Sequence, residues 1–470
     1  MLKQKRSSAA YYGILVLAGA LYALLALSRN VWADEAYTLA MLPHSLGEIW
    51  RITAADVHPP LYYFLAKLFT LPFGYSQYAL RLFSGACYFV ILAVGGRELS
   101  RLFGKKTGLW FMALYLLFPF SLEHAAEARM YALSSLGVFL CALFAYRAWL
   151  ENKVWDWVGF TAGGLCAAYS HYFALVAAGV IYGLLLLCCL LRRRRLLKPW
   201  LIFSAVTIAA YLPWLKCFIE QLAFKANNEY WIAPITLGSL AEDLMYVLHA
   251  NGTGIFPLVF GLLGLMFLFL LIREKAAAPL LALAVPALTL GLGVLISALL
   301  RPIFIIRYLV PCAPLIIFFV AYGISRIQSK TLYGAAAALL LTAFAGNLLF
   351  AVEDILPSPG RFDAAAAAQA EPAQAYLIQA GSDLHISQIT SYYDDVTPIY
   401  AAETLGAASP YPNIYPLSEF SPAQLQRVAV ITDALTPPDL SLLPGFRGEK
   451  LGTYQAAFDT IDLWLLEREQ

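Results

Sequence analysis

The sequence predicts a polytopic α-helical membrane protein with about 11 transmembrane helices, followed by a small extracytoplasmic α/β domain. Of the 470 residues, 61% are hydrophobic and only 13% are charged. Soluble domains average about 25% charged and about 45–50% apolar residues. The mean hydropathy of +0.68 is too high for a soluble core, so the bilayer must take up the apolar surface.

Apolar runs justify the helices in chain order. The first run follows the basic segment Met1–Arg6 and meets no small-residue cleavage site, so we expect an uncleaved first helix. The run at 154–191 would measure about 57 Å as one helix, nearly twice the hydrocarbon thickness, so it must turn, at Ser170-His171-Tyr172. The predicted spans are 11–28, 77–96, 107–122, 130–149, two within 154–191, 199–218, 254–272, 276–300, 308–324 and 332–352.

Basic residues set the expected orientation of these helices. The loops assigned to the cytoplasm hold about twice as many Lys and Arg residues as the opposite loops and helix ends, as the positive-inside rule requires. Within them, Arg192–Arg195 is interpreted as a topogenic run that contacts anionic lipid. We therefore expect a multi-pass plasma-membrane protein whose N-terminus is cytoplasmic and whose C-terminal domain is extracytoplasmic.

The chain divides into two predicted domains. Residues 1–357 form the transmembrane domain, with juxtamembrane helices in the loop at 29–76, of which Leu46–Ala55 is an amphipathic candidate. The apolar run at 59–75 is short and carries Lys67 at its middle, so we place it at the outer interface. Residues 358–470 form a soluble α/β domain with strands predicted at Ala375–Ile378, Val428–Thr432 and Asp462–Leu466. All seven cysteines lie outside that domain, without metal-ligand spacing.

Acids, histidines and arginines collect at the predicted outer ends of the helices. Ionisable residues at a membrane boundary are costly and indicate function. Arginine binds phosphate through paired hydrogen bonds, and a carboxylate can take a proton from an incoming hydroxyl. The pattern fits a substrate with a lipid-borne phosphate, and it also fits a transporter. The segments are Trp32–Tyr37, Asp56–Tyr63, Glu123–Tyr131, Tyr169–Tyr172 and Arg301–Tyr308.

The order of the motifs resembles one family, the GT-C type glycosyltransferases that use polyprenyl-phosphate sugars. This family is related to protein O-mannosyltransferases and to the aminoarabinose transferases of lipid A. The resemblance covers residues 10–350 and implies a GT-C-like fold, a lipid-linked sugar donor and catalysis on the extracytoplasmic face. The motifs are Asp34-Glu35, His58-Pro59-Pro60-Leu61-Tyr62-Tyr63, Leu80-Arg81-Leu82, Glu127-Ala128-Arg129-Met130-Tyr131-Ala132, Ser170-His171-Tyr172 and Arg307-Tyr308-Leu309.

The resemblance also implies a role for each matching residue. Asp34 is the implied catalytic base, with Glu35 beside it. One base and a cationic pocket for the leaving phosphate suffice for a single inverting displacement at a sugar C1. The aminoarabinose enzymes have a lysine before the Pro-Pro pair, where this chain has His58, so the same sugar is not implied. The implied substrate-binding residues are His58, Arg81, Glu127, Arg129, Tyr131, His171, Arg307 and Tyr308.

Several of these residues have structural alternatives. Asp34 can cap a juxtamembrane helix, and His58 can be a turn residue. Arg129 and Arg307 can be interface anchors at helix ends. By contrast, Glu123 and His124 are expected to be solvated loop residues.

We expect no required cofactor or metal. A divalent cation stays an alternative, because four residues have side chains that suit one: Asp34, Glu35, His58 and Glu127. The sequence has no short-range ligand motif that would indicate such a site. The expected partners are a polyprenyl-phosphate sugar donor, membrane lipids and a hydroxyl acceptor on a protein, a lipid or a wall polymer, with no nucleic acid. The expected activity is that of a hexosyl- or pentosyltransferase.

Two other function classes remain. A transporter or flippase of lipid-linked sugars would place charges near helix midpoints and would contain inverted repeats. The predicted helix interiors are apolar instead, and the polar groups lie at one end. A membrane scaffold whose tail binds a partner would leave the acids of the first loop without a purpose.

Overall fold

The structure, a computed structural model, describes residues 2–27, 33–227, 232–236, 238–239, 255–355, 373–379, 397–402, 409–455 and 460–469. The chain forms two compact units. The first comprises Met1–Leu27, Val57–Leu65 and Arg81–Val352, and the second comprises Ser28–Asp56, Ala66–Leu80 and Glu353–Gln470. Each unit is described by itself.

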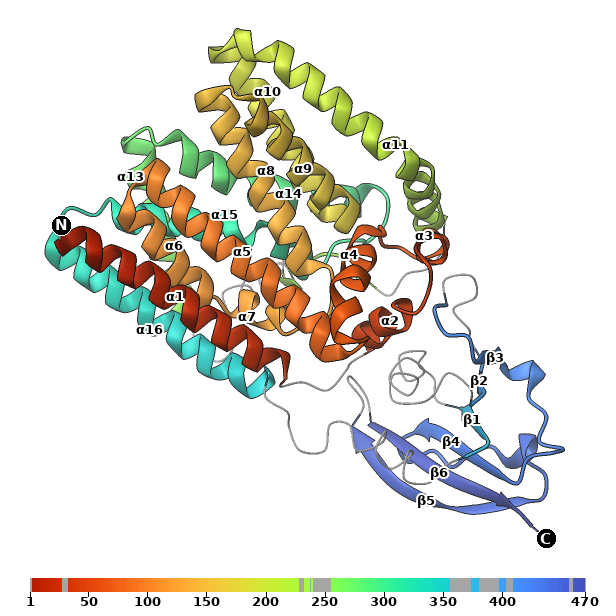
Figure 1. Ribbon diagram of the computed structural model, residues 1–470. Helices are drawn as coiled ribbons and strands as arrows, with labels where there is room; N and C mark the ends of the chain where they lie inside the picture. The colour runs from red at the N-terminus through yellow and green to blue at the C-terminus, as the bar shows by residue number, and fades with distance from the viewer. Residues whose placement is uncertain are drawn as a thin grey trace. The chain divides into compact units, whose positions relative to one another are not determined.

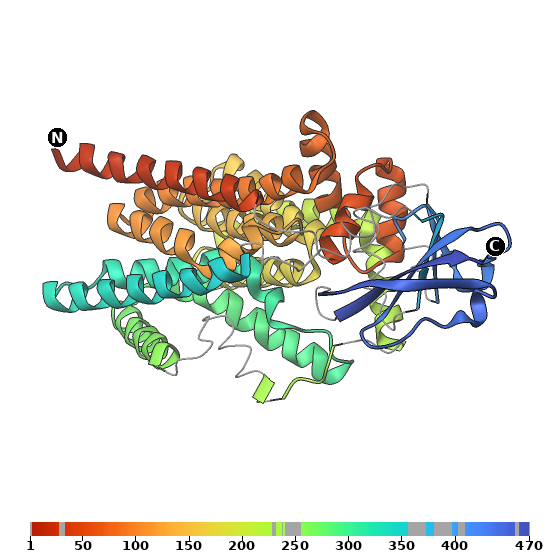
Figure 2. The same cartoon turned by 90° about the horizontal axis from the view of Figure 1, so that it is seen from below.

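The first unit is a bundle of apolar helices (Figure 1), and Figure 2 shows its long helices running alongside one another. A helix lies at every predicted span, which confirms the polytopic helical fold. Its helices are α1 (Leu2–Ala26), α5 (Gln77–Phe103), α6 (Lys105–Leu117), α7 (Pro119–Ala125), α8 (Tyr131–Glu151), α9 (Val154–Ser170), α10 (Tyr172–Arg192), η2 (Arg194–Leu196), α11 (Leu197–Asn227), α13 (Ile255–Arg273), α14 (Ala277–Leu299), the 3-10 helix η3 (Ile306–Cys312), α15 (Ala313–Ser325) and α16 (Lys330–Ile355).

Seven helices among the described residues are long and apolar enough to cross a bilayer, so the number of spans, about 11, stays a prediction. These seven are Ser8–Ala26, Gln77–Phe103, Tyr131–Glu151, Tyr172–Arg192, Arg194–Ala223, Ala277–Leu299 and Ile306–Ser325. The apolar run at 59–75 contains a short helix, α4 (Leu61–Thr70), which has ten residues. At 1.5 Å per residue it measures about 15 Å, half the thickness of the hydrocarbon layer.

Two helix boundaries follow from single residues. The predicted turn at Ser170-His171-Tyr172 is confirmed, because His171 leaves the helical region at φ −158° and ψ 139° between α9 and α10. The predicted span at 107–122 is interrupted instead, with Phe118 extended between α6 and α7. Pro119 explains the break, since proline disfavours helical geometry at the residue before it and suits the first turn of a new helix.

Helices α8 and α9 pack at unusually short range. A Cβ added at Gly137 of α8 would lie 2.6 Å from the Ala167 backbone nitrogen, and one at Gly163 of α9 would meet the Cys141 backbone. The two glycines therefore let the helix backbones touch, which is a common device where lipid supplies no hydrophobic drive for helix association.

The second unit combines part of the first loop with the C-terminal chain. α2 (Ala33–Met41) precedes α3 (Leu46–Ala55), whose bounds match the predicted juxtamembrane helix. A capping box starts α3: the Ser45 hydroxyl accepts from the Glu48 N–H, and the Glu48 carboxylate accepts from the Ser45 N–H. Within this unit, the His44 imidazole lies 2.8 Å from the Pro410 carbonyl oxygen.

The C-terminal chain forms a six-stranded sheet of order β3-β2-β1-β4-β6-β5. β1 to β4 pair in parallel, whereas β6 is antiparallel to both β4 and β5. The three predicted strands are confirmed as β1, β4 and β6, and the helix-favouring stretches between them lie largely outside the described residues. The strands are β1 (Ala375–Ile378), β2 (Ile399–Ala401), β3 (Ile414–Pro416), β4 (Arg427–Asp433), β5 (Phe446–Gln455) and β6 (Thr460–Arg468).

Candidate functional site

A buried cluster of polar rings forms in the first unit where α7, α8, α10 and η3 meet. The Tyr131 ring centroid lies 4.8 Å from that of His124 and 5.6 Å from that of His171. The His171 ring lies 5.0 Å from Tyr308 in turn. We call His124, Tyr131, His171 and Tyr308, with the carboxylate of Glu127, the ring cluster. Three chain segments that the sequence separates by tens of residues therefore converge on one place.

Glu127 is the acid of the ring cluster. Its Oε2 lies 2.5 Å from His124 Nδ1, and both residues are 4% exposed. A buried carboxylate is costly unless it is paired and hydrogen-bonded. The sequence prediction for His124 is wrong: the residue is a buried partner of Glu127 and not a solvated loop residue.

Hydroxyl groups fix the backbone around this pair. Ser84 of α5 donates its hydroxyl to the Glu127 carbonyl oxygen at 2.7 Å. Ser135 of α8 donates to the Tyr131 carbonyl at 2.8 Å and to the Val310 carbonyl at 3.2 Å, which ties α8 to η3. The irregular segment before α8 is therefore held by side chains of neighbouring helices, as buried backbone polar groups require.

His171 has a defined hydrogen-bonding role. As the residue before α10, it accepts the Phe173 N–H on its Nδ1 at 3.2 Å. A ring nitrogen that accepts a hydrogen bond carries no proton, so the neutral imidazole must carry its proton on Nε2. Nε2–H is then the hydrogen-bond donor of this ring.

Two arginines of the first unit are buried near these groups. Arg129 is 4% exposed, and its Nη1 donates to the Tyr63 hydroxyl at 3.4 Å. Arg81 is fully buried in α5, one turn before Ser84. Arg307 and His58 are half-buried, at η3 and just before α4. The guanidinium groups offer donors in the fork geometry that phosphate oxygens match.

The two acids of the first loop belong to the second unit. Asp34 and Glu35 lie in the first turn of α2, where negative charge is favoured by the helix dipole. Asp34 is half-buried and Glu35 is fully buried. The Thr38 hydroxyl donates to the backbone carbonyl oxygen of Asp34 at 3.0 Å.

The structure brings four of the predicted site residues together through His124: Glu127, Tyr131, His171 and Tyr308. A fifth, Arg129, contacts Tyr63 instead. Sequence reasoning missed His124 and the hydroxyl of Tyr63 as parts of this site. The signal for His124 was its spacing, because it stands three residues before Glu127, a distance that brings two side chains together on a helical turn. Among the described residues, no group of three acids, histidines or cysteines is arranged to hold a metal ion.

Comparisons with known proteins give the fold its context. The family model for dolichyl-phosphate-mannose-protein mannosyltransferase matches residues 57–216. That segment contains the histidine, glutamate and arginine motifs from His58 to His171. A comparison with curated proteins finds no match.

Two crystal structures of ArnT from Cupriavidus metallidurans are similar over nearly the whole chain. The structure bound to undecaprenyl phosphate is 13% identical, covers 96% of this chain and 97% of its own, and superposes with a TM-score of 0.64. The apo structure is 14% identical, covers 98% of both chains and has a TM-score of 0.67. The chain thus has the GT-C-like membrane fold that its motifs predicted, and the similarity extends through the C-terminal domain.

Proposed function

We propose that the protein is a membrane glycosyltransferase that moves a sugar from a polyprenyl-phosphate carrier to a hydroxyl acceptor on the extracytoplasmic face. The ring cluster carries this proposal, because it gathers predicted substrate-binding residues from three segments into one buried site. The overall similarity to a structure that holds undecaprenyl phosphate supports the choice of donor.

The proposed donor is anchored through its phosphate. Arg129 and Arg307 supply the positive charge that a glycosyl phosphate needs, and Arg307 adjoins Tyr308 of the ring cluster. Charge on the phosphate grows as the bond to the sugar breaks, so fixed guanidinium groups stabilise the transition state more than the ground state. His171 Nε2–H and the tyrosine hydroxyls can hold sugar hydroxyls in place.

The proposed reaction is a single inverting displacement. The acceptor oxygen forms a bond to the sugar C1 while the bond from C1 to the phosphate oxygen breaks, and polyprenyl phosphate leaves. Asp34 takes the acceptor proton, with Glu35 as the neighbouring acid; this role rests on the motif resemblance. We propose no metal step. The sugar is a hexose or a pentose, and the acceptor is a protein, a lipid or a wall polymer.

Donor class is the test of this proposal. Purified protein in liposomes is given a membrane extract as acceptor and either a polyprenyl monophosphate sugar or a nucleotide sugar, and transfer of label to the acceptor is measured. We expect transfer from the lipid-linked donor. The Arg307→Ala variant should need a higher donor concentration, because it lacks a phosphate contact. Transfer from the nucleotide sugar alone would overturn the proposal.

A further inference from the structure

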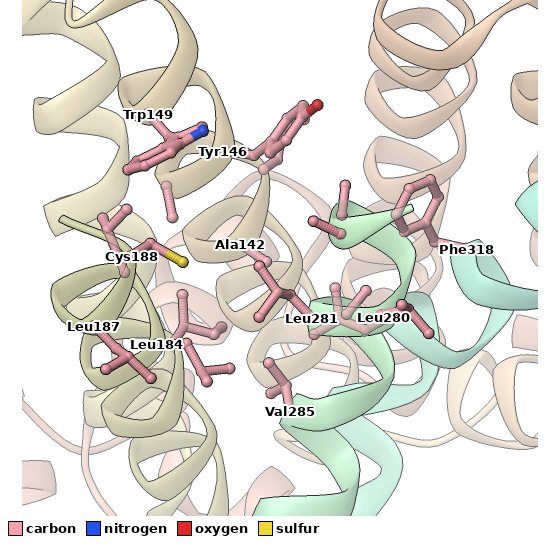
Figure 3. A pocket seen from close by; sticks show the side chains of 18 of the residues that line it. Ala142, Tyr146, Trp149, Leu184, Leu187, Cys188, Leu280, Leu281, Val285 and Phe318 are labelled. Carbon is pink, nitrogen blue, oxygen red and sulfur yellow. The ribbon is translucent and has the colours of Figure 1, made fainter. Parts of the chain in front are cut away.

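A cavity lies in the first unit, and no residue of the ring cluster lines it. It has a volume of about 510 Å³ and is lined by α5, α8, α10, α14 and α15. Figure 3 shows side chains of α10, among them Leu184 and Cys188, on one wall and Leu281 and Val285 of α14 on the other. The walls are apolar almost throughout, with aliphatic and aromatic side chains, and the volume falls in the range of about 300–1,000 Å³ that small ligands occupy.

The depth of the cavity matches one leaflet of a bilayer. On α10 its lining runs from Ile181 to Arg192, which at 1.5 Å per residue is about 16 Å. Half of the hydrocarbon layer measures about 15 Å. His171 stands at the other end of the same helix, about 30 Å from Arg192, so the cavity and the ring cluster face opposite leaflets.

One end of the cavity carries the side chains that are typical of the lipid headgroup region of a membrane. The Tyr146 hydroxyl and the Trp149 indole nitrogen lie at the same end in Figure 3, and Arg192 lines the cavity on the last turn of α10. The Arg193 guanidinium stacks 4.8 Å from the Trp149 ring and donates to the Trp149 carbonyl at 2.5 Å. Tyrosine, tryptophan and arginine are the residues that gather at the membrane–water interface.

Positive charge is in excess at this end of the cavity. The nearby carboxylates already have partners: Glu98 and Glu151 pair with Arg101, and Asp156 pairs with Arg147. In contrast, none of the arginines at 192–195 forms an ion pair with another described residue. Arg192, which lines the apolar cavity and has no ion-pair partner among the described residues, favours a ligand that has a negative head and a hydrocarbon chain.

We propose that this cavity binds an acyl chain of an anionic phospholipid, with the phosphate at Arg192. The proposal is independent of the proposed function, since it concerns the opposite end of the bundle from the ring cluster. It commits to a membrane phospholipid, and the tail of the polyprenyl carrier is the competing occupant.

The test is lipid retention by the full-length protein. Detergent-solubilised protein is equilibrated with equal amounts of phosphatidylglycerol, phosphatidylcholine and decaprenyl phosphate, and bound lipids are counted by native mass spectrometry. We expect phosphatidylglycerol to be retained over phosphatidylcholine. Arg192→Gln should lower its retention roughly fivefold, the effect of one basic residue at an anionic surface. Ala142→Phe, which places a ring in the cavity, should remove the bound phospholipid.

Matched variants separate the cavity from the general surface. Arg194→Gln removes a charge from the same run, and Leu190→Phe adds a ring to an exposed position of α10, and neither residue lines the cavity. Both should retain lipid as the wild type does. If Ala142→Phe does not fold, Ala282→Phe fills the cavity from α14. The proposal would be overturned if all variants retained equal amounts of phospholipid. It would also be overturned if Ala142→Phe or Ala282→Phe lost decaprenyl phosphate instead of phospholipid.

Discussion

At the scale of single residues, the site is organised around a carboxylate that is kept away from water. Glu127 lies 2.5 Å from His124, and its backbone is held by Ser84. The sequence predicts Glu127, Arg129 and Tyr131 as site residues because they form one motif with a family resemblance. It does not predict His124 as the partner of Glu127. A histidine in a short polar segment is expected to be a solvated loop residue, and only the packing of neighbouring helices shows that it is buried.

The proposed base gives the first prediction. Asp34→Asn keeps the shape and most hydrogen bonds of the side chain but removes its basicity, so turnover should fall by about 10²–10⁴-fold. Donor affinity should change little, because the base acts on the acceptor. Steady-state rates and donor binding, measured on folded protein, check both statements.

Glu35→Gln is the control for that prediction. It alters the neighbouring acid of the same helical turn, which is fully buried and in which we place no proton transfer. Normal turnover in Asp34→Asn with loss of turnover in Glu35→Gln would move the base by one residue. Full activity of both variants would show that the first loop is not catalytic.

At the scale of secondary structure, hydrophobic runs predict where helices lie, and proline and histidine decide where they stop. The turn at His171 follows from the length of its run, whereas the break at Phe118 depends on Pro119 in the middle of an apolar stretch. The close approach of α8 and α9 could not be predicted, because glycines in an apolar helix do not reveal which neighbour they contact.

That contact gives the second prediction. Gly137→Ala should destabilise the protein by about 1–3 kcal/mol, because the added Cβ has no room against the Ala167 backbone. Gly179→Ala is the matched control: the residue is exposed on α10 with nothing within 4 Å of an added Cβ, and alanine should keep or raise stability by up to about 1 kcal/mol. Thermal unfolding in detergent measures both. Equal stability of the two variants would contradict the close packing of α8 on α9.

The C-terminal sheet gives the third prediction. Asp462 of β6 is buried, 2.8 Å from Lys450 Nζ, and it accepts from the Thr453 hydroxyl at 2.7 Å and the Leu435 N–H at 3.0 Å. Burial alone would raise the pKa of Asp462, but these hydrogen bonds and the Lys450 charge hold it below its usual value. Asp462→Asn should therefore cost about 1–3 kcal/mol at neutral pH.

The pH dependence of that loss has a definite sign. Because the folded pKa is lowered, the carboxylate stabilises the sheet above its unfolded pKa of about 3.9, and this contribution disappears as the pH falls through the lower folded pKa. Hydrogen exchange of the β6 amides in the full chain should show a constant difference between wild type and Asp462→Asn from pH 7 to 5, and a shrinking one below about 4. A difference that does not shrink as the pH falls below about 4 would contradict this role.

At the scale of the whole molecule, composition predicts the membrane as solvent, and the order of the motifs predicts the GT-C-like fold. The uneven distribution of Lys and Arg residues between the loops predicts the orientation of the protein in the membrane, and this gives the fourth prediction. In a cysteine-free background, Ser441→Cys should react with an impermeant thiol reagent on intact cells, and Lys330→Cys should react only after permeabilisation. The reverse pattern would place the C-terminal domain in the cytoplasm and contradict the assignment of an extracytoplasmic site.

The central claim is that the protein breaks the bond between a sugar and its lipid phosphate. The fate of that bond in liposomes tests it most directly: a polyprenyl phosphate sugar labelled in the sugar is supplied with acceptor, and free polyprenyl phosphate is measured beside the labelled product. We predict that the wild type forms both in equal amounts, and that Asp34→Asn forms about 10²–10⁴-fold less of each in the same time. A labelled donor that stays intact while it moves to the other leaflet would identify a flippase and contradict the account.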